Sequence, residues 1–455
     1  MAEIKTQIPG YCTKVMTVLN SAGFECFIVG GAVRDIVMGK IPSDYDVTTS
    51  ATPEETIAAL DKEGIRYVPT GLKHGTVMAV LDDEKVEITT FRVDGEYSDM
   101  RRPDSVTFTR SVDEDVLRRD FTINAMYLDK SGDIIDRTGG LEDIALRRIR
   151  AVGDPDKRFD EDALRIMRGL RFAAQTGFTI ENHTFDAMVR HAPSLKKISG
   201  ERIATELNHL VVAPFATEVI RRSVPILREI IPEIAACEGF DQRSVFHDRD
   251  VLEHILGVID SVRIEESGTR DLNLALAALF HDIAKPACFW LDHHGWGHMK
   301  GHPEASALVA QRVLTELHYP NSIRDEVVKL VRYHDFFIPE QRYSVHRFMS
   351  NCGPVFARRL MILQKADIQA HSSRGKKRSD HLDRVDEIMQ ELIDEGVVFS
   401  VSDLDISGKD LIAMGIPEGP HVGEVMETLF DEYLMEEIPN DRESLLKRAK
   451  EIRIK

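Results

Sequence analysis

The stretch that decides the fold of the first part of the chain is Phe27-Ile-Val-Gly-Gly-Ala-Val-Arg-Asp35, followed by Ser43-Asp-Tyr-Asp-Val47. Three apolar residues predict a buried strand that ends at Gly30-Gly31, and a helix is expected to follow the glycines. A strand that turns through Gly-Gly into a helix leaves backbone N–H groups and a positive helix end facing outward, which suits a phosphate group. Arg34 adds a forked donor beside this turn.

Two acidic residues follow this turn closely in the chain. Asp44 and Asp46 alternate with apolar or aromatic neighbours, so that on a strand both carboxylates would project to the same face. Two carboxylates on one face can hold Mg²⁺ that bridges a triphosphate and an attacking hydroxyl. Each motif by itself is also typical of a tight turn or of a solvated strand edge. Their combination favours a phosphoryl-transfer site.

Strand patterns continue through the first third of the chain and then give way to helices. Thr76–Leu81 and Lys85–Thr90 flank an acidic turn and predict a hairpin, and Ala125–Leu128 with Ile134-Ile135 predicts a second pair. From about Glu161 onward, helical periodicity replaces the strand pattern. A β-containing head followed by an all-helical remainder predicts an α+β fold and not a doubly wound sheet.

Composition limits the protein class. A formal net charge of −18 argues weakly against a nucleic-acid partner, because phosphate contacts need Lys and Arg, but local basic clusters such as Arg118-Arg119 occur. The five cysteines are odd in number and form no CxxC pair, which argues against a disulfide framework and a thiolate zinc site. The sequence contains no apolar run of membrane-spanning length, and Met1–Lys5 lacks the apolar core that a signal peptide needs. We therefore expect a cytoplasmic protein with no membrane partner.

The order of motifs resembles a known superfamily. Gly30-Gly31 followed by Asp44 and Asp46 resembles the polymerase β-type nucleotidyltransferases. The segments that follow resemble the class II tRNA nucleotidyltransferases, the CCA-adding enzymes of bacteria and eukaryotes. In chain order these segments are Thr70–Thr76, Val86–Arg92, Arg118–Met126, Asp136–Gly140, Glu161–Arg168 and Ser199–Leu207. The match covers at least residues 25–210 in the order of the family.

The resemblance implies a function and a domain order. It implies a nucleotidyltransferase head over 1–140, and a helical neck and body over 141–240. The implied activity is addition of C, C and A to the 3′ end of a tRNA that lacks all or part of its CCA end, from CTP and ATP, with release of pyrophosphate. No stable protein partner is implied. Asp44 and Asp46 would hold Mg²⁺, with Glu87 as a third carboxylate. The residues expected to bind the nucleotide are Gly30, Gly31, Arg34, Arg119, Asn124, Asp162, Arg165, Arg168 and Arg171.

The last four of these residues carry their own argument. Because they recur every three residues, we expect them on one helical face. An Asp beside an Arg offers an acceptor and a fork of donors, which imitates a base edge. Cytosine and adenine present an amino donor beside a ring nitrogen, whereas uracil and guanine present a carbonyl there. The segment therefore predicts base selection, although a solvated salt-bridge helix has the same spacing. The polar loop Arg92–Pro103 resembles the flexible element that lets family members progress from C to A.

A second set of residues lies further along the chain and resembles the HD phosphohydrolases. In order, these residues are His254, His281, Asp282, His302, His334 and Asp367. Imidazoles and carboxylates from several helices suit a metal site in a bundle, and imidazoles favour Ni²⁺, Mn²⁺, Co²⁺ or Fe²⁺ over Mg²⁺ alone. The resemblance implies an HD metal-binding domain over 241–375, followed by a helical, tRNA-binding tail over 376–455.

Two alternatives remain open. The nearer is a poly(A) polymerase or an enzyme that adds only CC, since both are built on the same head. The other is a hydrolase or nucleotide sensor in which the head serves only as a binding module.

Overall fold

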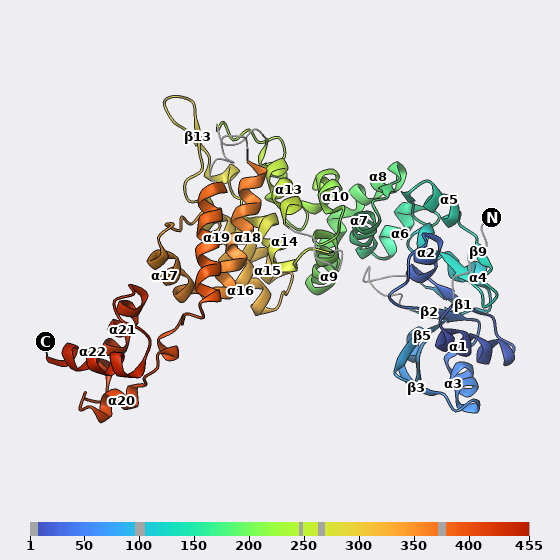
Figure 1. The fold of residues 1–455 in the computed structure, drawn as a ribbon. Helices are drawn as coiled ribbons and strands as arrows, with labels where there is room; N and C mark the ends of the chain where they lie inside the picture. The colour runs from blue at the N-terminus through green and yellow to red at the C-terminus, as the bar shows by residue number, and fades with distance from the viewer. Residues whose placement is uncertain (1–7, 96–104, 245–248, 263–268, 372–378, 455) are drawn as a thin grey trace. The chain divides into compact units, whose positions relative to one another are not determined.

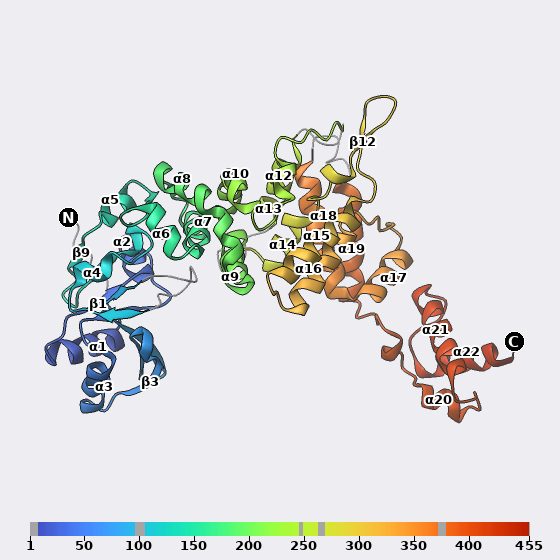
Figure 2. The same cartoon turned by 180° about the vertical axis from the view of Figure 1, so that it is seen from behind.

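The computed structural model describes residues 8–95, 105–244, 249–262, 269–371 and 379–454. The chain forms two compact units (Figures 1 and 2). The first unit consists of Met1–Ala235, Ile264–Arg270 and Val313–Tyr319. The second unit consists of Ala236–Arg263, Asp271–Arg312 and Pro320–Lys455. None of the helices in the described ranges is long and apolar enough to cross a membrane.

The first unit begins with a mixed seven-stranded sheet in the order β3-β4-β5-β2-β1-β8-β9. Its strands are β1 (Cys26–Val29), β2 (Asp46–Thr49), β3 (Arg66–Gly71), β4 (Thr76–Leu81), β5 (Glu84–Thr90), β8 (Met126–Leu128) and β9 (Ile134–Asp136). Strand β1 pairs antiparallel with β2 and β8, and β2 pairs parallel with β5. The two predicted hairpins, β4–β5 and β8–β9, are confirmed.

Both faces of the sheet are covered near β1, because its four residues are all buried and alternate between two cores. Ile28 packs in a core with the helices α1 (Gly10–Ser21), α2 (Gly31–Val37) and α3 (Pro53–Lys62). Phe27 belongs to a second core on the other face. The sheet is therefore held on two sides, and the turn that follows β1 starts from a fixed position.

The rest of the first unit is mostly helical, apart from short strand pairs. Its further elements are β6 (Arg92–Asp94), β7 (Val106–Phe108), α4 (Val112–Val116), α5 (Gly140–Ala145), β10 (Arg148–Ile149), α6 (Pro155–Glu161), α7 (Leu164–Thr176), β11 (Thr179–Ile180), α8 (Asn182–His191), α9 (Gly200–Val211), α10 (Ala216–Arg222) and α11 (Val224–Leu227). A mixed sheet followed by a largely helical remainder confirms the α+β prediction at this level.

The second unit is a helical bundle with a helical tail. Its helices are α13 (Val251–Ser261), α14 (Leu272–Phe280), most of α15 (His302–Glu316), α16 (Asn321–Tyr333), α17 (Arg342–Cys352), α18 (Pro354–Ala370), α19 (Ser379–Asp394), α20 (Gly408–Ala413), α21 (Pro420–Leu434) and α22 (Arg442–Ile454). Every residue of Leu274–Phe280 is buried, as expected for a helix that is apolar on all sides and lies at the centre of a bundle. Helices α20 to α22 share a core of their own.

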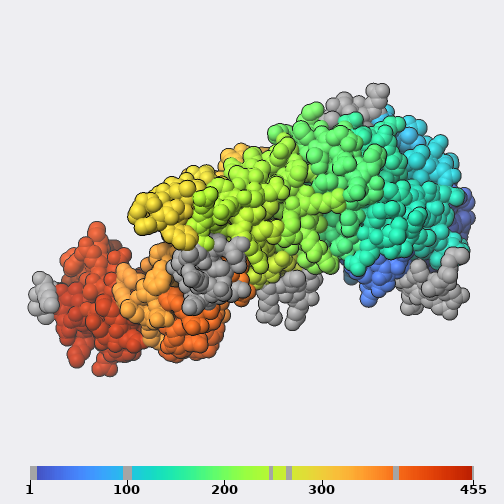
Figure 3. All heavy atoms as spheres, turned by 90° about the horizontal axis from the view of Figure 1, so that it is seen from above, coloured from blue at the N-terminus to red at the C-terminus, as the bar shows by residue number. Residues whose placement is uncertain are grey.

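A short hairpin connects α14 and α15 in the second unit. Its strands are β12 (Trp290–Leu291) and β13 (Gly297–His298), and the Trp290 and His298 rings stack with centroids 4.6 Å apart. In the space-filling view of Figure 3, this yellow segment stands out from the surface of its unit.

Candidate functional site

The glycine turn and Asp46 are brought together by strand pairing. Val29, the last residue of β1, pairs with Asp46, the first residue of β2. The chain then leaves the sheet through Gly30, whose φ of 76° lies in the region that favours glycine, and enters α2 at Gly31. The side chain of Asp46 is therefore placed beside the Gly30-Gly31 turn. This juxtaposition follows from the sheet register.

The three predicted carboxylates gather near the end of β2, with one correction. Strand β2 begins at Asp46, so the expectation that Asp44 also lies on the strand is wrong. The physical reason is that β1 ends at Val29, which leaves the residues before Asp46 without an antiparallel partner. Glu87 immediately precedes Ile88, the partner of Val47 in the parallel pair β2–β5. Asp46 and Glu87 therefore occupy equivalent positions on adjacent strands.

The electrostatics of Asp46 fit a bound cation. Asp46 is exposed to the cavity. Desolvation by the surrounding protein, followed by the charges of Glu87 and Asp44, raises its pKa to about 6, although Arg119 opposes the shift. Carboxylates that repel one another in a partly dry site are stabilised by a divalent cation, and their oxygens are the ligands that Mg²⁺ prefers. The donor set of Asp44, Asp46 and Glu87 is thus suitable for Mg²⁺.

A cavity of about 760 Å³ in the first unit contains most of the predicted residues. The predicted residues in its wall are Gly30, Gly31, Arg34, Asp44, Asp46, Arg119, Asn124, Arg168 and Arg171. Lys40 and His209 also line it. Its wall thus combines carboxylates for a cation with guanidinium groups for phosphate oxygens. Such a wall suits a nucleoside triphosphate.

Arg119 is positioned by a buried network that the sequence analysis missed. Asp115 in α4 has no exposed surface and accepts hydrogen bonds from Arg118 Nε at 2.8 Å and from Arg119 Nη2 at 2.9 Å. The hydroxyl of Tyr127 also donates to Asp115, at 2.8 Å. Burial opposes the charge of Asp115, but Arg119, Arg118 and Tyr127 together lower its pKa to about 2. The spacing of Asp115 from the two arginines, three and four residues, was a signal for this network.

We expect Asp115→Asn to destabilise the first unit by about 3–5 kcal/mol, because it removes the partner of two largely buried guanidinium groups. Since the pKa of Asp115 is lower in the folded state than in the unfolded state, its stabilisation is complete above about pH 4 and is lost as the pH falls through about 2. Hydrogen exchange of the β1 and β2 amides measures the opening of this unit. Asp113→Asn on the same helix is the control, because Asp113 is 65% exposed. An equal effect of both variants would contradict the role of Asp115.

The four residues expected on one face of the base-selecting helix do not share a face. Helix α7 begins at Leu164, so Asp162 lies before it, where it accepts from Leu164 N at 3.0 Å and from Arg202 Nη2 at 2.9 Å. Arg165 is buried and donates to the backbone oxygen of Arg118 at 2.9 Å. On a helix with 3.6 residues per turn, side chains three residues apart point in directions that differ by about 60°. Successive arginines of α7 therefore point progressively away from a single face.

Arg168 and Arg171 do reach the cavity. Their guanidinium groups lie over the ring of Phe172, at 5.2 and 4.4 Å from its centroid, and Arg34 lies over the same ring at 5.4 Å. Arg168 Nε donates to Asp120 at 2.8 Å, and Arg171 pairs with Glu206 at 3.2 Å. Phe172, Asp120 and Glu206 therefore orient the arginines. Neither the spacing nor the residue type of the arginines predicted these contacts with Phe172, Asp120 and Glu206.

The predicted loop Arg92–Pro103 is only partly described. Arg92–Asp94 forms strand β6, which pairs antiparallel with β7. This start of the predicted loop is therefore a strand and not a loop. The remaining segment, 96–103, lies outside the described residues.

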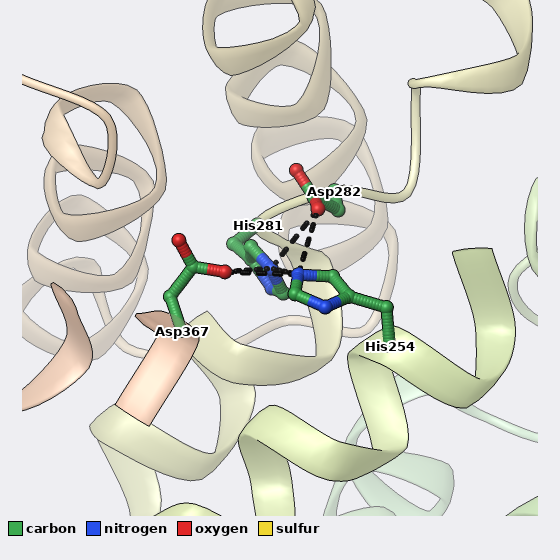
Figure 4. Close-up of side chains that lie close together, drawn as sticks. All are labelled: His254, His281, Asp282 and Asp367. Atoms are coloured by element: carbon green, nitrogen blue, oxygen red, sulfur yellow. Dashed lines mark hydrogen bonds and ion pairs between the residues drawn. The ribbon is translucent and has the colours of Figure 1, made fainter. Parts of the chain in front are cut away.

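All six residues of the second predicted set come together in the second unit. Figure 4 shows His254 from α13, His281 and Asp282 from the end of α14, and Asp367 from α18 converging on one point. Potential ligand atoms form two groups, each with its atoms within 4.8 Å of one another. The groups are His254, His281, Asp282 and Asp367, and Asp282, His302 and His334. Asp282 belongs to both, so its two oxygens can serve two adjacent ions.

Three of the four histidines are oriented as metal ligands usually are. The Nδ1 atoms of His281, His302 and His334 lie 2.7–2.9 Å from the backbone oxygens of Ala278, Met299 and Val331. An Nδ1–H that donates to a carbonyl leaves the lone pair of Nε2 free for a metal. The Nε2 atoms of His302 and His334 lie 3.3 Å apart, as do those of His281 and His254. Two facing lone pairs repel, and a cation between them removes this repulsion.

The charges of the cluster also favour a cation. Burial opposes charge on His281, but Asp282 and Asp367 raise its pKa to about 10. The neighbouring histidines hold the pKa of Asp282 and of Asp367 well below the usual range, against the effect of burial. The cluster therefore attracts positive charge, and its mixed nitrogen and oxygen donors suit a transition metal. His371, which the sequence analysis missed, lies 3.5 Å from Asp367 and one helical turn beyond it.

Comparison with known proteins gives matches over most of the chain. A family model described as the poly A polymerase head domain matches residues 26–150. A second model, described as a probable RNA and SrmB-binding site of polymerase A, matches residues 177–237. A third model, of the second domain of tRNA nucleotidyltransferases, matches residues 299–449. A CCA-adding enzyme of Streptococcus pyogenes serotype M2 is 46% identical over 227 residues, which are 50% of this chain and 53% of that protein. The chain thus spans about half the length of the curated relatives it matches.

Solved structures match over nearly the whole chain. The Bacillus stearothermophilus CCA-adding enzyme in complex with CTP is 27% identical, covers 97% of this chain and 96% of its own, and superposes with a TM-score of 0.73. The Thermotoga maritima CCA-adding enzyme, at 18% identity, covers 98% and 96% with a TM-score of 0.60 and shares the fold.

Proposed function

We propose that this chain is a CCA-adding tRNA nucleotidyltransferase, which adds C, C and A to the 3′ end of tRNA from CTP and ATP and releases pyrophosphate. The observation that carries the proposal is the cavity of the first unit, in which the Gly30-Gly31 turn, Asp44, Asp46 and four arginines meet. The likeness to the CCA-adding enzymes of Streptococcus pyogenes and Bacillus stearothermophilus supports the choice of tRNA and CTP as substrates.

The residues of the cavity divide the work of phosphoryl transfer. Asp44, Asp46 and Glu87 would hold Mg²⁺, which when bound neutralises the triphosphate and activates the 3′-hydroxyl of the tRNA for attack on the α-phosphate. Arg119 and Arg34 take up phosphate or sugar oxygens, and the buried carboxylate of Asp115 keeps Arg119 in place. Orientation of the two substrates supplies a large part of the acceleration.

The proposal is tested with a tRNA that lacks its CCA end, Mg²⁺, and CTP and ATP supplied singly and together, with products sized to the nucleotide. We expect addition of two nucleotides with CTP alone and of three with both. Products that stop after two nucleotides with both substrates would indicate a CC-only enzyme. Long products with ATP alone would indicate a poly(A) polymerase.

Base selection is proposed to depend on Asp162 and Arg165. Asp162 acts within electrostatic range of Arg168, which lies in the cavity wall. Arg165 is held by Glu161 at 2.7 Å and by the Arg118 carbonyl, so it must exchange these partners to meet a base.

We expect Asp162→Ala to raise the incorporation of UMP or GMP relative to CMP and AMP by about 5- to 150-fold, the equivalent of one unmatched polar group. The measurement is kcat/KM for each single nucleotide on a truncated tRNA. Asp160→Ala is the matched control, because Asp160 is a neighbouring carboxylate that is 64% exposed. An unchanged preference in Asp162→Ala would exclude the base-edge hypothesis. Arg165→Ala is less suited, because it also breaks a buried network.

We also propose that the second unit is a metal-dependent phosphohydrolase of the HD type, which acts on phosphate esters or 2′,3′-cyclic phosphates of nucleotides or RNA ends. Its two ligand groups around Asp282 favour this function. A bound Ni²⁺, Mn²⁺, Co²⁺ or Fe²⁺ would activate water for attack on phosphorus. Lys285, whose Nζ lies 2.5 Å from Asp282, orients that carboxylate and adds positive charge for a phosphate.

A further inference from the structure

The residues proposed to bind metal, here called the metal-ligating cluster, are His254, His281, Asp282, His302, His334 and Asp367. A cavity beside this cluster has no role in the functions proposed so far. It measures about 300 Å³, at the lower end of the range for small-molecule sites. It is bounded by His334–Ile338, by α18 and by the start of α19. His334 and Asp367 belong both to its wall and to the cluster. A molecule in this cavity would therefore lie directly against the metal ligands.

One wall of the cavity is aromatic and open. Phe337 is 67% exposed, although an aromatic side chain of this size is usually buried. Its ring stacks on that of His381, with centroids 4.7 Å apart and planes inclined by 8°. Parallel aromatic rings at the edge of a cavity offer a flat surface on which a nucleobase can stack. An exposed phenylalanine at this position favours a planar ligand.

A buried polar group in the cavity wall determines which planar ligand fits. Gln364 is only 6% exposed, and its Nε2 donates to the carbonyl of Phe336 at 2.8 Å, which fixes the orientation of the amide. Its Oε1 is buried and has no hydrogen-bond partner among the described residues. A buried acceptor without a partner costs free energy, and a ligand that donates an N–H group to this acceptor removes that cost.

We propose that this cavity is the base subsite of the second unit, which holds an amino-bearing nucleobase while the attached phosphate lies at the metal-ligating cluster. The base stacks on Phe337 and donates its exocyclic amino group to Gln364 Oε1. This inference rests on the proposed phosphohydrolase function, for which it names the substrate class: nucleotides of adenine or cytosine, in preference to phosphates without a base. Hypoxanthine presents a carbonyl where adenine has its amino group, so Gln364 Oε1 would repel it.

The test compares three ligands that share a phosphorylated ribose. AMP, IMP and ribose 5-phosphate are titrated into the Mn²⁺-loaded full chain by isothermal titration calorimetry, and the binding that persists in Phe337→Ala is assigned to the first unit. For any ligand that the protein hydrolyses, KM is compared in place of Kd. We expect AMP to bind on the order of tenfold more tightly than IMP, and more tightly still than ribose 5-phosphate.

Two variants separate the stacking surface from the hydrogen bond. Gln364→Met, of similar volume, should reduce the affinity for AMP to that for IMP. Phe337→Ala changes an exposed position that does not endanger folding, and it should lower the affinities for both nucleotides to nearly that for ribose 5-phosphate. Ile362→Ala is the control, since Ile362 is 43% exposed on the same helix as Gln364 and lies outside the cavity wall. Equal affinities for the three ligands in the wild type, or variants that behave like this control, would overturn the inference.

Failure of the underlying function gives a different result. If metal analysis finds no bound metal and no phosphate ester is hydrolysed, the phosphohydrolase proposal fails. The preference for AMP over IMP, and its loss in Gln364→Met, remain measurable in that case and decide the base subsite separately. If metal and hydrolysis are present but the three ligands bind equally, only the base subsite is wrong.

Discussion

Asp46→Ala is expected to lower the rates of CMP and AMP transfer together, each by at least about 10³-fold. The physical reason is that the proposed Mg²⁺ serves both nucleotides and contributes several kcal/mol to the stabilisation of the transition state. Asp46 is the first residue of β2 and lies beside the Gly30-Gly31 turn. Single-turnover rates are measured with CTP on a tRNA without its CCA end, and with ATP on one that ends in CC.

The structure also predicts that this loss is not caused by unfolding. The pKa of Asp46 is raised by its surroundings, so its charge opposes folding near neutral pH in the absence of metal. The alanine variant should therefore unfold at the same temperature as the wild type or at a higher one. Asp83→Ala, at an exposed turn of the same sheet, is the control and should transfer both nucleotides normally. Loss of only one nucleotide's addition in Asp46→Ala would contradict a shared metal site.

His281→Ala and Asp282→Ala are each expected to remove bound metal and phosphate-ester hydrolysis while CCA addition continues. Asp282 contributes to both ligand groups, so its loss should remove the metal from each of them. Loss of an activating metal removes the nucleophile of the reaction, and a decrease of at least about 10³-fold in hydrolysis is expected. Metal content is measured on the purified protein by mass spectrometry, and hydrolysis is measured with 2′,3′-cyclic AMP.

Matched controls distinguish the cluster from the histidine-rich hairpin nearby. His293→Ala changes an exposed histidine that belongs to neither ligand group. It should leave metal content and hydrolysis unchanged. Asp46→Ala should likewise keep hydrolysis, so that the two activities are lost independently. A protein that binds none of Ni²⁺, Mn²⁺, Co²⁺ or Fe²⁺ and hydrolyses nothing would reduce the second unit to a helical scaffold.

The strands and their pairing around the first site could be predicted from the sequence because the signals were local. Phe27-Ile-Val followed by two glycines specified a buried strand and a turn, and the acidic turn after Leu81 specified a hairpin. The order of six histidine and aspartate residues indicated a metal site, and the structure brings all six together. Metal ligands are identifiable in a sequence because few other roles require so many buried ionisable groups.

Only the tertiary structure decided which side chains face each site. The arginines of α7 have the same spacing, yet Arg165 turns inward to the Arg118 carbonyl and Arg168 reaches the cavity, because a three-residue step rotates around the helix. Gln364 gained its importance from a partner distant in the sequence, and Asp115 gained its importance from its burial. Local patterns in the sequence determined the elements and the ligand types of this protein. The long-range packing of those elements determined burial, and burial determines what each polar group must bind.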